Sequence, residues 1–286
     1  GKAGAFELNV SSDLDIILVY RDQGETAPPP GSNARSISSS EFFHHVARKA
    51  IGELSELRAD GFVFRIDTWL RPNGDSGPLV LSLAMLEQYF LVQGREWERF
   101  AWLKSRVITD TGVQSWQGGD AQTEQRELKS IVDPFVFRRY VDYRVFDGLK
   151  GLHQLIRSEA LKKDLKAPGT LDVKLGEGGM IDLEFIIHYS QLAYRIGISP
   201  DLRMAIDGLA DAQLIDPELR PAHDLLTRLL VVLRLVSPNL QIPTVATRAL
   251  IARACGSNDW NGLIVRLDAA RQAVKTAWQG IVNGAD

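Results

Sequence analysis

The sequence predicts an α+β protein in which a mixed sheet with flanking helices precedes a helical bundle. Two segments, 14–20 and 61–67, are rich in β-branched and large apolar residues and end at polar or turn-forming runs, as strands do. After about residue 128 the apolar residues recur at helical spacing instead. We therefore expect a domain that contains the sheet over residues 1–125 and a helical bundle domain over residues 126–286.

The composition is that of an ordinary globular protein and excludes several classes of function. The 286 residues are 45% hydrophobic and 24% charged, and a net charge of -3 provides no general basic field, so nucleic acid is not expected as a partner. The single cysteine, Cys255, cannot form an intrachain disulfide, and no Cys/His spacing indicates zinc. The most apolar stretch, 225–236, contains Arg228 and Arg234 and is too short to span a membrane. No signal-peptide pattern opens the chain, so we expect a cytoplasmic protein with no membrane partner.

The first domain is predicted to begin with a strand, a loop and a helix. The strand 14–20 stops at a polar run, and the stretch 23–40, which contains three consecutive prolines, predicts a mobile loop. Ser38 to Glu41 fit a capping box, so a helix of about four turns is expected to start there. The apolar residues at roughly helical spacing in this helix are Phe42, Val46, Ile51 and Leu54.

The remaining elements follow the same periodicity arguments. The second strand, 61–67, ends at the turn-rich segment 72–78, and a strand, a turn and another helix account for the chain to about residue 107. Gly256 and Ser257 form a stop-and-cap signal before the last helix. The apolar stripes of the bundle are Val141, Val145, Leu149, Leu152 and Ile156; Leu225, Leu229 and Leu233; and Trp260, Leu263, Leu267, Val274, Trp278 and Ile281.

Three aspartates mark a candidate metal site. Side chains two residues apart in a strand point to the same face, so Asp13 and Asp15 present their carboxylates side by side, and Asp67 at the end of the second strand can supply a third. Carboxylate oxygens suit Mg²⁺, and two such ions about 3.5–4 Å apart can clamp the oxygens of a phosphoryl displacement. We predict all three as catalytic metal ligands. The alternative is that Asp13 and Asp15 form a solvated turn or cap at a strand edge.

Several longer runs of sequence resemble one known family. They are ELNVSSDLD at 7–15, DTWLRP at 67–72, GDSGPLV at 74–80, GREWER at 94–99, FVFRRY at 135–140 and KLGEGG at 174–179. Taken together they resemble the bifunctional glutamine synthetase adenylyltransferase/adenylyl-removing enzymes, over most of the chain and more weakly after about residue 200. Two departures are Ala5, where a second Gly or Ser is usual, and Trp69, where Arg is frequent.

The resemblance implies a polymerase-β-like nucleotidyltransferase fold with a following helical domain. It also implies Mg²⁺ as cofactor, and glutamine synthetase, the signalling protein PII, ADP or ATP and phosphate as partners. The family carries two related nucleotidyltransferase halves, and this chain is long enough for one, without the helices that normally precede the first motif.

The direction of the reaction is left open by the resemblance. Residues 76–80 and 94–99 resemble the N-terminal half, which removes AMP from a tyrosine of glutamine synthetase by phosphorolysis and yields ADP. Residues 178–185 resemble the AMP-adding C-terminal half, because Ile181 stands where the N-terminal half usually has Arg. Further alternatives are a non-catalytic module that senses nucleotides or docks partners, and a uridylyltransferase that modifies PII.

Other residues are candidates for binding phosphate. Arg95, Arg99, Trp102 and Arg106 fall on one helical face that can meet phosphate or an acidic partner, or else forms a solvated face paired with neighbouring glutamates. The five histidines show no metal spacing and are expected to be satisfied surface or core residues.

A glycine-rich run and the helix after it complete the candidates. Gly176, Gly178 and Gly179 precede a helix whose free N–H groups attract anions, or else form a tight interhelical turn. Asp182 and Glu184 lie about 200° apart on an ideal helix and cannot both face one metal, and we retain Glu184. The nucleotide- or phosphate-binding candidates are Gly4, Ser11, Ser12, Arg71, Lys104, Lys174 and Glu184.

Overall fold

The computed structural model describes residues 1–10, 12–108, 121–138, 150–159, 162, 171–237 and 241–284. The chain forms two compact units: unit 1 contains Gly1–Leu8 and Ser12–Arg138, and unit 2 contains Asn9–Ser11 and Arg139–Asp286. The expected boundary at residue 125 falls inside α4 (Ala121–Val136). That helix packs against α2 (Leu83–Val92) and α3 (Glu96–Leu103), so the chain divides after Arg138 instead.

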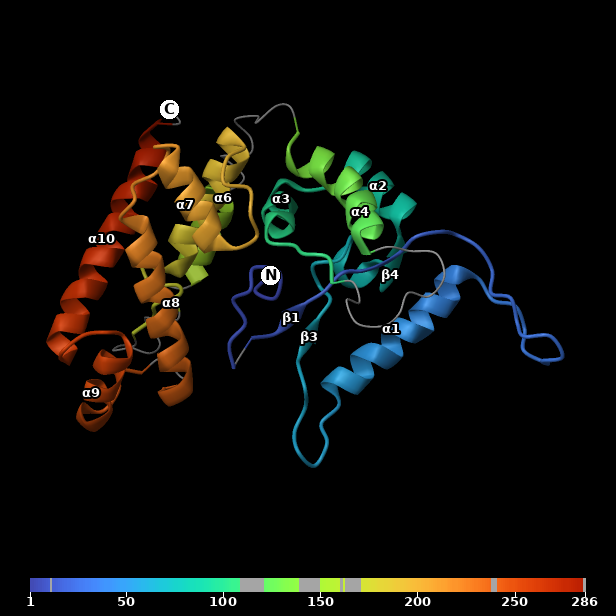
Figure 1. Ribbon diagram of the computed structural model, residues 1–286, viewed down its shortest axis with the longest axis horizontal. Helices are drawn as coiled ribbons and strands as arrows, with labels where there is room; N and C mark the ends of the chain where they lie inside the picture. Colours follow the sequence, from blue (N-terminus) through green and yellow to red (C-terminus); the bar gives the residue numbers. More distant parts are fainter. Residues whose placement is uncertain are drawn as a thin grey trace. The chain divides into compact units, whose positions relative to one another are not determined.

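Unit 1 contains two short parallel strand pairs in its described part. Strand β1 (Leu14–Asp15) pairs with β3 (Ile66–Asp67), and β2 (Leu18–Tyr20) pairs with β4 (Val80–Ser82). Figure 1 shows β1 and β3 lying side by side. The α+β class is confirmed, whereas the expected mixed sheet is corrected, for the described residues, to two parallel pairs.

The expected strands 14–20 and 61–67 are both shorter in the structure. The first is interrupted between Asp15 and Leu18, and only the last two residues of the second form a strand. Asp67 accepts a hydrogen bond at Oδ1 from the Trp69 amide at 2.7 Å, so the chain turns where β3 would have to continue. Because its first partner ends there, the strand beginning at Leu18 pairs with β4 instead.

The helices of unit 1 follow their local signals. Helix α1 (Ser39–Ser55) begins where the capping box predicts, with the Ser38 side chain accepting from the Glu41 amide at 3.2 Å. The turn-rich segment 72–78 contains a short 3₁₀ helix, η1 (Gly74–Ser76). In the expected loop 23–40, Glu25 and Ser38 form an isolated antiparallel bridge.

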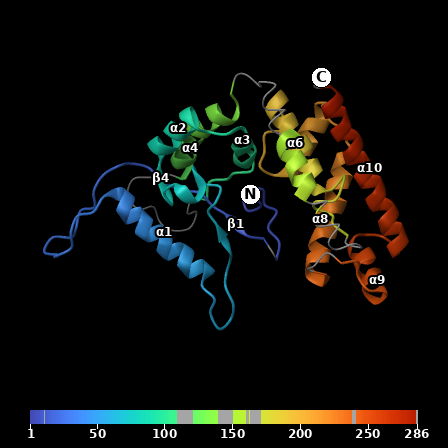
Figure 2. The ribbon, with the colours of Figure 1, turned by 180° about the vertical axis from the view of Figure 1, so that it is seen from behind.

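Unit 2 is helical in its described part, as expected. Residues 150–159 are helical, and α6 (Met180–Tyr194), α7 (Leu202–Asp211), α8 (Leu219–Val236), α9 (Val245–Ala254) and α10 (Trp260–Gly284) share one core. Figures 1 and 2 both show α10 running alongside α8. The predicted stripes of α8 and α10 are confirmed: their buried members are Leu225, Leu229, Leu233, Leu263, Leu267 and Val274.

Two details of unit 2 complete its comparison with the sequence. Gly256 has a φ of +69° just after α9, as a helix-ending glycine does. The cap of α10 is Asp259 rather than Ser257, because Asp259 Oδ1 accepts from the Gly262 amide at 2.7 Å. Val141, Val145 and Leu149 lie outside the described residues. No helix in the part of the chain that the structure describes is both long and apolar enough to span a bilayer.

Candidate active site

The predicted acids lie where β1 meets β3. The parallel register places Asp15 beside Asp67, and the ladder hydrogen bonds Leu14 N to Arg65 O at 2.8 Å and Ile16 N to Asp67 O at 2.9 Å hold it. Neighbouring strands are about 4.8 Å apart, so the backbones of Asp15 and Asp67 are in lateral contact. Two residues before this pair, and outside the two strands, Asp13 forms an ion pair with Arg65.

Each of the three acids has a different environment. Asp13 is exposed and forms an ion pair with Arg65, with Nε 2.6 Å from Oδ1. Asp67 is exposed and caps the turn at Trp69, whereas Asp15 is half-buried and packs against Gly1. Asp13, Arg65 and Asp67 line one open cavity of about 460 Å³, and Asp15 borders another of about 660 Å³.

The residues fit a magnesium ion by donor chemistry and by backbone register. Three carboxylates on adjacent strands are the oxygen ligands that Mg²⁺ prefers, and two of the three are open to water. Their side chains do not converge: within the described residues, no group of three or more His, Cys, Asp and Glu side chains is arranged to hold a metal ion. Asp13 is instead paired with Arg65, and Asp67 accepts from the Trp69 amide.

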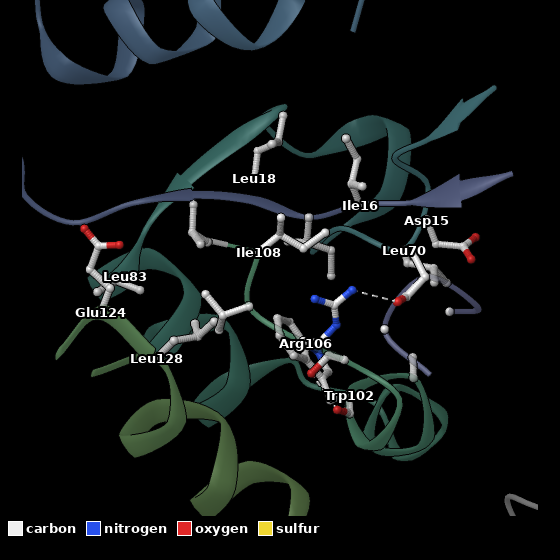
Figure 3. A pocket seen from close by; sticks show the side chains of 18 of the residues that line it. Asp15, Ile16, Leu18, Leu70, Leu83, Trp102, Arg106, Ile108, Glu124 and Leu128 are labelled. Carbon is white, nitrogen blue, oxygen red and sulfur yellow. Dashed lines mark hydrogen bonds between the residues drawn. The ribbon is translucent and has the colours of Figure 1, made fainter. Parts of the chain in front are cut away.

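The larger cavity combines apolar walls with charged side chains, and its cationic side chains are Arg21, Lys104 and Arg106. Figure 3 shows Arg106 reaching into it from the chain after α3, with Asp15 near Leu70 at the side. The guanidinium of Arg106 donates to the carbonyl of Ala3 at 3.2 Å and lies 4.4 Å from the ring centroid of Phe6. A cation in an apolar-walled space is suited to bind an anionic group.

Two nucleotide-binding candidates make contacts within the protein beside this cavity. A Cβ on Gly4 would lie 2.0 Å from the carbonyl oxygen of Lys104, so the chain needs glycine there for its own close backbone contact. Lys104 is buried and its Nζ lies 3.2 Å from Glu7 Oε2. Both residues therefore support the N-terminal segment that lines the cavity.

The other candidates of the first domain are dispersed. Arg71 is buried and donates to Thr68 and to Asp75 Oδ1, so it fixes the turn after β3. Ser12 is half-buried next to Asp13. Ser11 lies outside the described residues.

The expected arginine face on α3 is wrong. Arg99 is 1% exposed, and its Nε donates to the carbonyl of Val136 at 2.8 Å while Nη1 bonds Glu96 at 2.8 Å. Trp102 is buried as well, and Arg106 lies beyond the last residue of α3. The charge of Arg99 is satisfied by Glu96 and by a backbone carbonyl inside unit 1, rather than by a ligand or water.

A second buried charge on α3 is also satisfied internally. Glu98, 5% exposed, accepts from the Tyr89 hydroxyl at 2.7 Å and from the Arg95 amide at 2.8 Å. Burial, and then the hydrogen bond to Glu98, raise the pKa of Tyr89 to about 12. This contact holds α2 to the start of α3.

The glycine-rich run before α6 packs against the protein itself. The amides of Met180 and Ile181 donate to the carbonyls of Val173 and Lys174, both at 3.1 Å, and the Gly178 amide donates to Asp182 Oδ2 at 2.7 Å. The predicted anion site is therefore corrected: these amides are occupied by protein acceptors. A Cβ on Gly178 would meet the carbonyl oxygen of Arg271 at 2.3 Å, so this glycine allows close packing against α10.

Asp182 is a buried acid of this region with several hydrogen-bond donors around it. Besides Gly178 it contacts His153 Nε2 at 2.7 Å and Arg157 Nη2 at 3.0 Å. Glu184, which the sequence reasoning retained, is half-buried, and Lys174 is too. An acid in the first helical turn is a capping signal, and that signal favours Asp182 over Glu184.

Two family models match consecutive parts of the chain. Residues 1–118 match glutamate-ammonia ligase adenylyltransferase, and residues 150–281 match GlnD PII-uridylyltransferase. Both descriptions are of nucleotidyltransferases, which is the class that the paired aspartates predict.

Comparison with individual relatives identifies the family within this class. The chain is 43% identical over 98% of its length to the bifunctional glutamine synthetase adenylyltransferase/adenylyl-removing enzyme of Burkholderia mallei, and 38% identical over 96% to that of Ralstonia nicotianae. The matched segments cover 31% and 30% of those two proteins, so the chain spans about a third of their length. The chain belongs to the family of these bifunctional enzymes, as the sequence motifs predicted.

Proposed function

We propose that the chain is a Mg²⁺-dependent nucleotidyltransferase module that acts on glutamine synthetase. The register of Asp15 with Asp67, and Asp13 beside them at an open cavity, is the observation that carries the proposal. The family membership supports it, because the relatives are named as enzymes that add AMP to glutamine synthetase and remove it. The corresponding architecture is a nucleotidyltransferase fold in unit 1, with unit 2 as its helical companion.

The favoured reaction is removal of AMP. An oxygen of inorganic phosphate forms a bond to the α-phosphorus of AMP-tyrosine, the bond from phosphorus to the tyrosine oxygen breaks, and ADP and the tyrosine are released, the phenolate taking a proton from water. Asp13, Asp15 and Asp67 would hold Mg²⁺, which supplies charge neutralisation for phosphoryl transfer when bound. Arg106, in the cavity that Asp15 borders, binds the phosphate in this proposal.

The test is ADP formation by the whole chain. Adenylylated glutamine synthetase, phosphate and Mg²⁺ are incubated with the chain, and ADP is measured. Asp13→Ala is expected to lower the rate at least about 100-fold, as loss of an electrostatic catalytic group does. Asp60→Ala, which removes an exposed carboxylate from the turn before β3, is the matched control and should leave the rate unchanged. Equal rates for the two variants would refute the catalytic role of Asp13.

The second candidate function is addition of AMP. The run at residues 178–185 favours it, because Ile181 is typical of the AMP-adding half. In this direction Asp67 accepts the proton of the tyrosine hydroxyl as ATP transfers AMP and pyrophosphate leaves. Incorporation of labelled AMP from ATP, with no ADP from the adenylylated substrate, would select this direction.

We also propose PII as a partner of unit 2. The support is the match of residues 150–281 to a family whose name includes PII-uridylyltransferase. The measurement is PII binding to the immobilised whole chain. Absence of binding in the presence and absence of ATP would refute this part of the proposal and leave the catalytic part standing.

A further inference from the structure

Arg65 directly precedes β3 and Asp67 ends it, and these two opposite charges lie beside Asp13 and Asp15 of the neighbouring segment. The register pairs Asp15 with Asp67, two like charges, and places Asp13 against Arg65, two unlike charges. Asp13, Arg65 and Asp67 line one cavity, whereas Asp15 borders another. The place where the two strands meet therefore carries three negative charges and one positive charge.

In the described part of the chain, the counter-charge beside Asp13 is the guanidinium of Arg65. Arg65 Nε lies 2.6 Å from Asp13 Oδ1, with the side chains 60% and 48% exposed. Like charges opposite each other on adjacent strands are destabilising, and a nearby cation reduces that repulsion. Arg65 thus neutralises part of this negative charge. Its partner, Asp13, is a carboxylate that the proposed site needs for binding an ion.

Both members of the pair line the cavity that Asp67 borders. Asp13, Arg65 and Asp67 share the cavity of about 460 Å³ with Trp69 and Asp75. An ion that enters there meets a carboxylate already engaged by an arginine and is repelled by the guanidinium charge.

We propose that Arg65 is a built-in competitor of the divalent cation: it holds Asp13 when no ion is present and must release it for the ion to be bound by all three acids. Arg65 thereby lowers the affinity of the site for the cation. This inference rests on the proposed function, since it uses the same acids. Arg65 is a positioning residue, acting through Asp13.

The affinity of the site for Mn²⁺ and Mg²⁺, measured by calorimetry on the whole chain, tests the inference without an activity assay. Arg65→Gln removes the charge and keeps a polar side chain, and it is expected to lower the Kd about two- to fivefold, the range that an exposed ion pair supplies. Arg65→Lys keeps the charge and should stay near the wild-type Kd. Arg58→Gln is the matched control, because Arg58 is an exposed arginine in the segment before β3 that pairs with Glu53 and Glu56.

The outcomes separate this inference from the function it rests on. Cation binding that is lost in Asp13→Ala, together with a lower Kd in Arg65→Gln alone, supports both. Asp13-dependent binding with an unchanged or higher Kd in Arg65→Gln overturns the competitor role and leaves the metal site standing. A lower Kd in both Arg65→Gln and Arg58→Gln also overturns it, because general charge then explains the effect. No binding in the wild type or in Arg65→Gln overturns both.

Discussion

The two units each contain an aspartate paired with an arginine, and the two pairs differ in what surrounds them. In unit 1, the Asp13 side chain is 48% exposed and forms an ion pair with Arg65. In unit 2, the Asp182 side chain is 5% exposed and is held by His153, Arg157 and the Gly178 amide. Water can replace Arg65 at little cost, whereas nothing replaces the three donors around Asp182.

The same pair of residue types has a structural role in one unit and can exchange its partner in the other. A buried carboxylate surrounded by donors joins the helix at 150–159, the glycine-rich run and α6, so its role is structural. An exposed carboxylate with one exchangeable partner can accept an ion without unfolding its surroundings. Burial and the number of donors, rather than the sequence motif around the acid, separate these two roles.

The largest effect on stability is expected from removing the buried carboxylate of Asp182. Asp182→Ala leaves His153, Arg157 and the Gly178 amide without their acceptor, so it is expected to lower the free energy of unfolding by about 3–5 kcal/mol. Asp13→Ala should change it by less than about 1 kcal/mol. Urea denaturation followed by circular dichroism measures both. A similar loss of unfolding free energy in the two variants would contradict the different roles assigned to Asp13 and Asp182.

The next prediction concerns Gly178, which packs closely against α10 beside Asp182. Gly178 has a φ of +68°, and a Cβ there would lie 2.3 Å from the carbonyl oxygen of Arg271. Gly178→Ala is expected to cost about 2–3 kcal/mol, which combines left-handed strain with the backbone clash. Gly280→Ala in α10, where a Cβ meets nothing within 4 Å, should instead stabilise by about 0.5–1 kcal/mol. A neutral Gly178→Ala would argue for an open, ligand-accessible run.

The hydrogen bond between Tyr89 and the buried Glu98 tests whether a buried acid also stabilises unit 1. Its hydrogen bond and the burial of Tyr89 raise the pKa of the phenol to about 12 from an ordinary 10, so the folded state binds this proton more tightly than the unfolded state. The associated stability is fully present below pH 10 and falls as pH rises from about 10 through 12, by about 2–3 kcal/mol. Tyr89→Phe should remove this part of the decline. Wild type and variant declining in parallel over that interval would contradict the assignment.

The smallest effect is expected at the exposed pair itself. Arg65→Gln should change the free energy of unfolding by less than about 0.5 kcal/mol at 0.15 M salt, because an exposed ion pair is well screened. Thermal and urea denaturation at low and high salt measure it. A loss of 2 kcal/mol or more would show that Arg65 supports the fold and would weaken its assignment as an exchangeable counter-charge.

Much of the fold was predictable from local signals. The Ser38 cap, the helix after it, and the apolar stripes of α8 and α10 depend on contacts within a few residues along the chain, and all were confirmed. The two acidic strand ends were also predictable, because each adjoins an apolar segment. The strand lengths were not, since Leu14–Tyr20 changes partner between β3 and β4.

The candidate site divides in the same way. Asp13, Asp15 and Asp67 were found from spacing and family motifs, and their register was then supplied by the structure. The burial of Arg99 was not predictable, because a charged residue in an amphipathic pattern looks the same whether it faces water or a buried partner. His153, which lies outside every motif, could be linked to Asp182 only through packing.

The sequence by itself determined where helices begin, which of their faces are apolar, the family to which the chain belongs, and which acids stand at the strand ends. These follow from bonds between residues close in the chain and from ordered motifs. Only the tertiary structure decided which strands pair, that Arg65 holds Asp13, and that Asp182 is buried among donors. Strand pairing and burial join residues distant in sequence, so their energies depend on what the rest of the chain brings alongside.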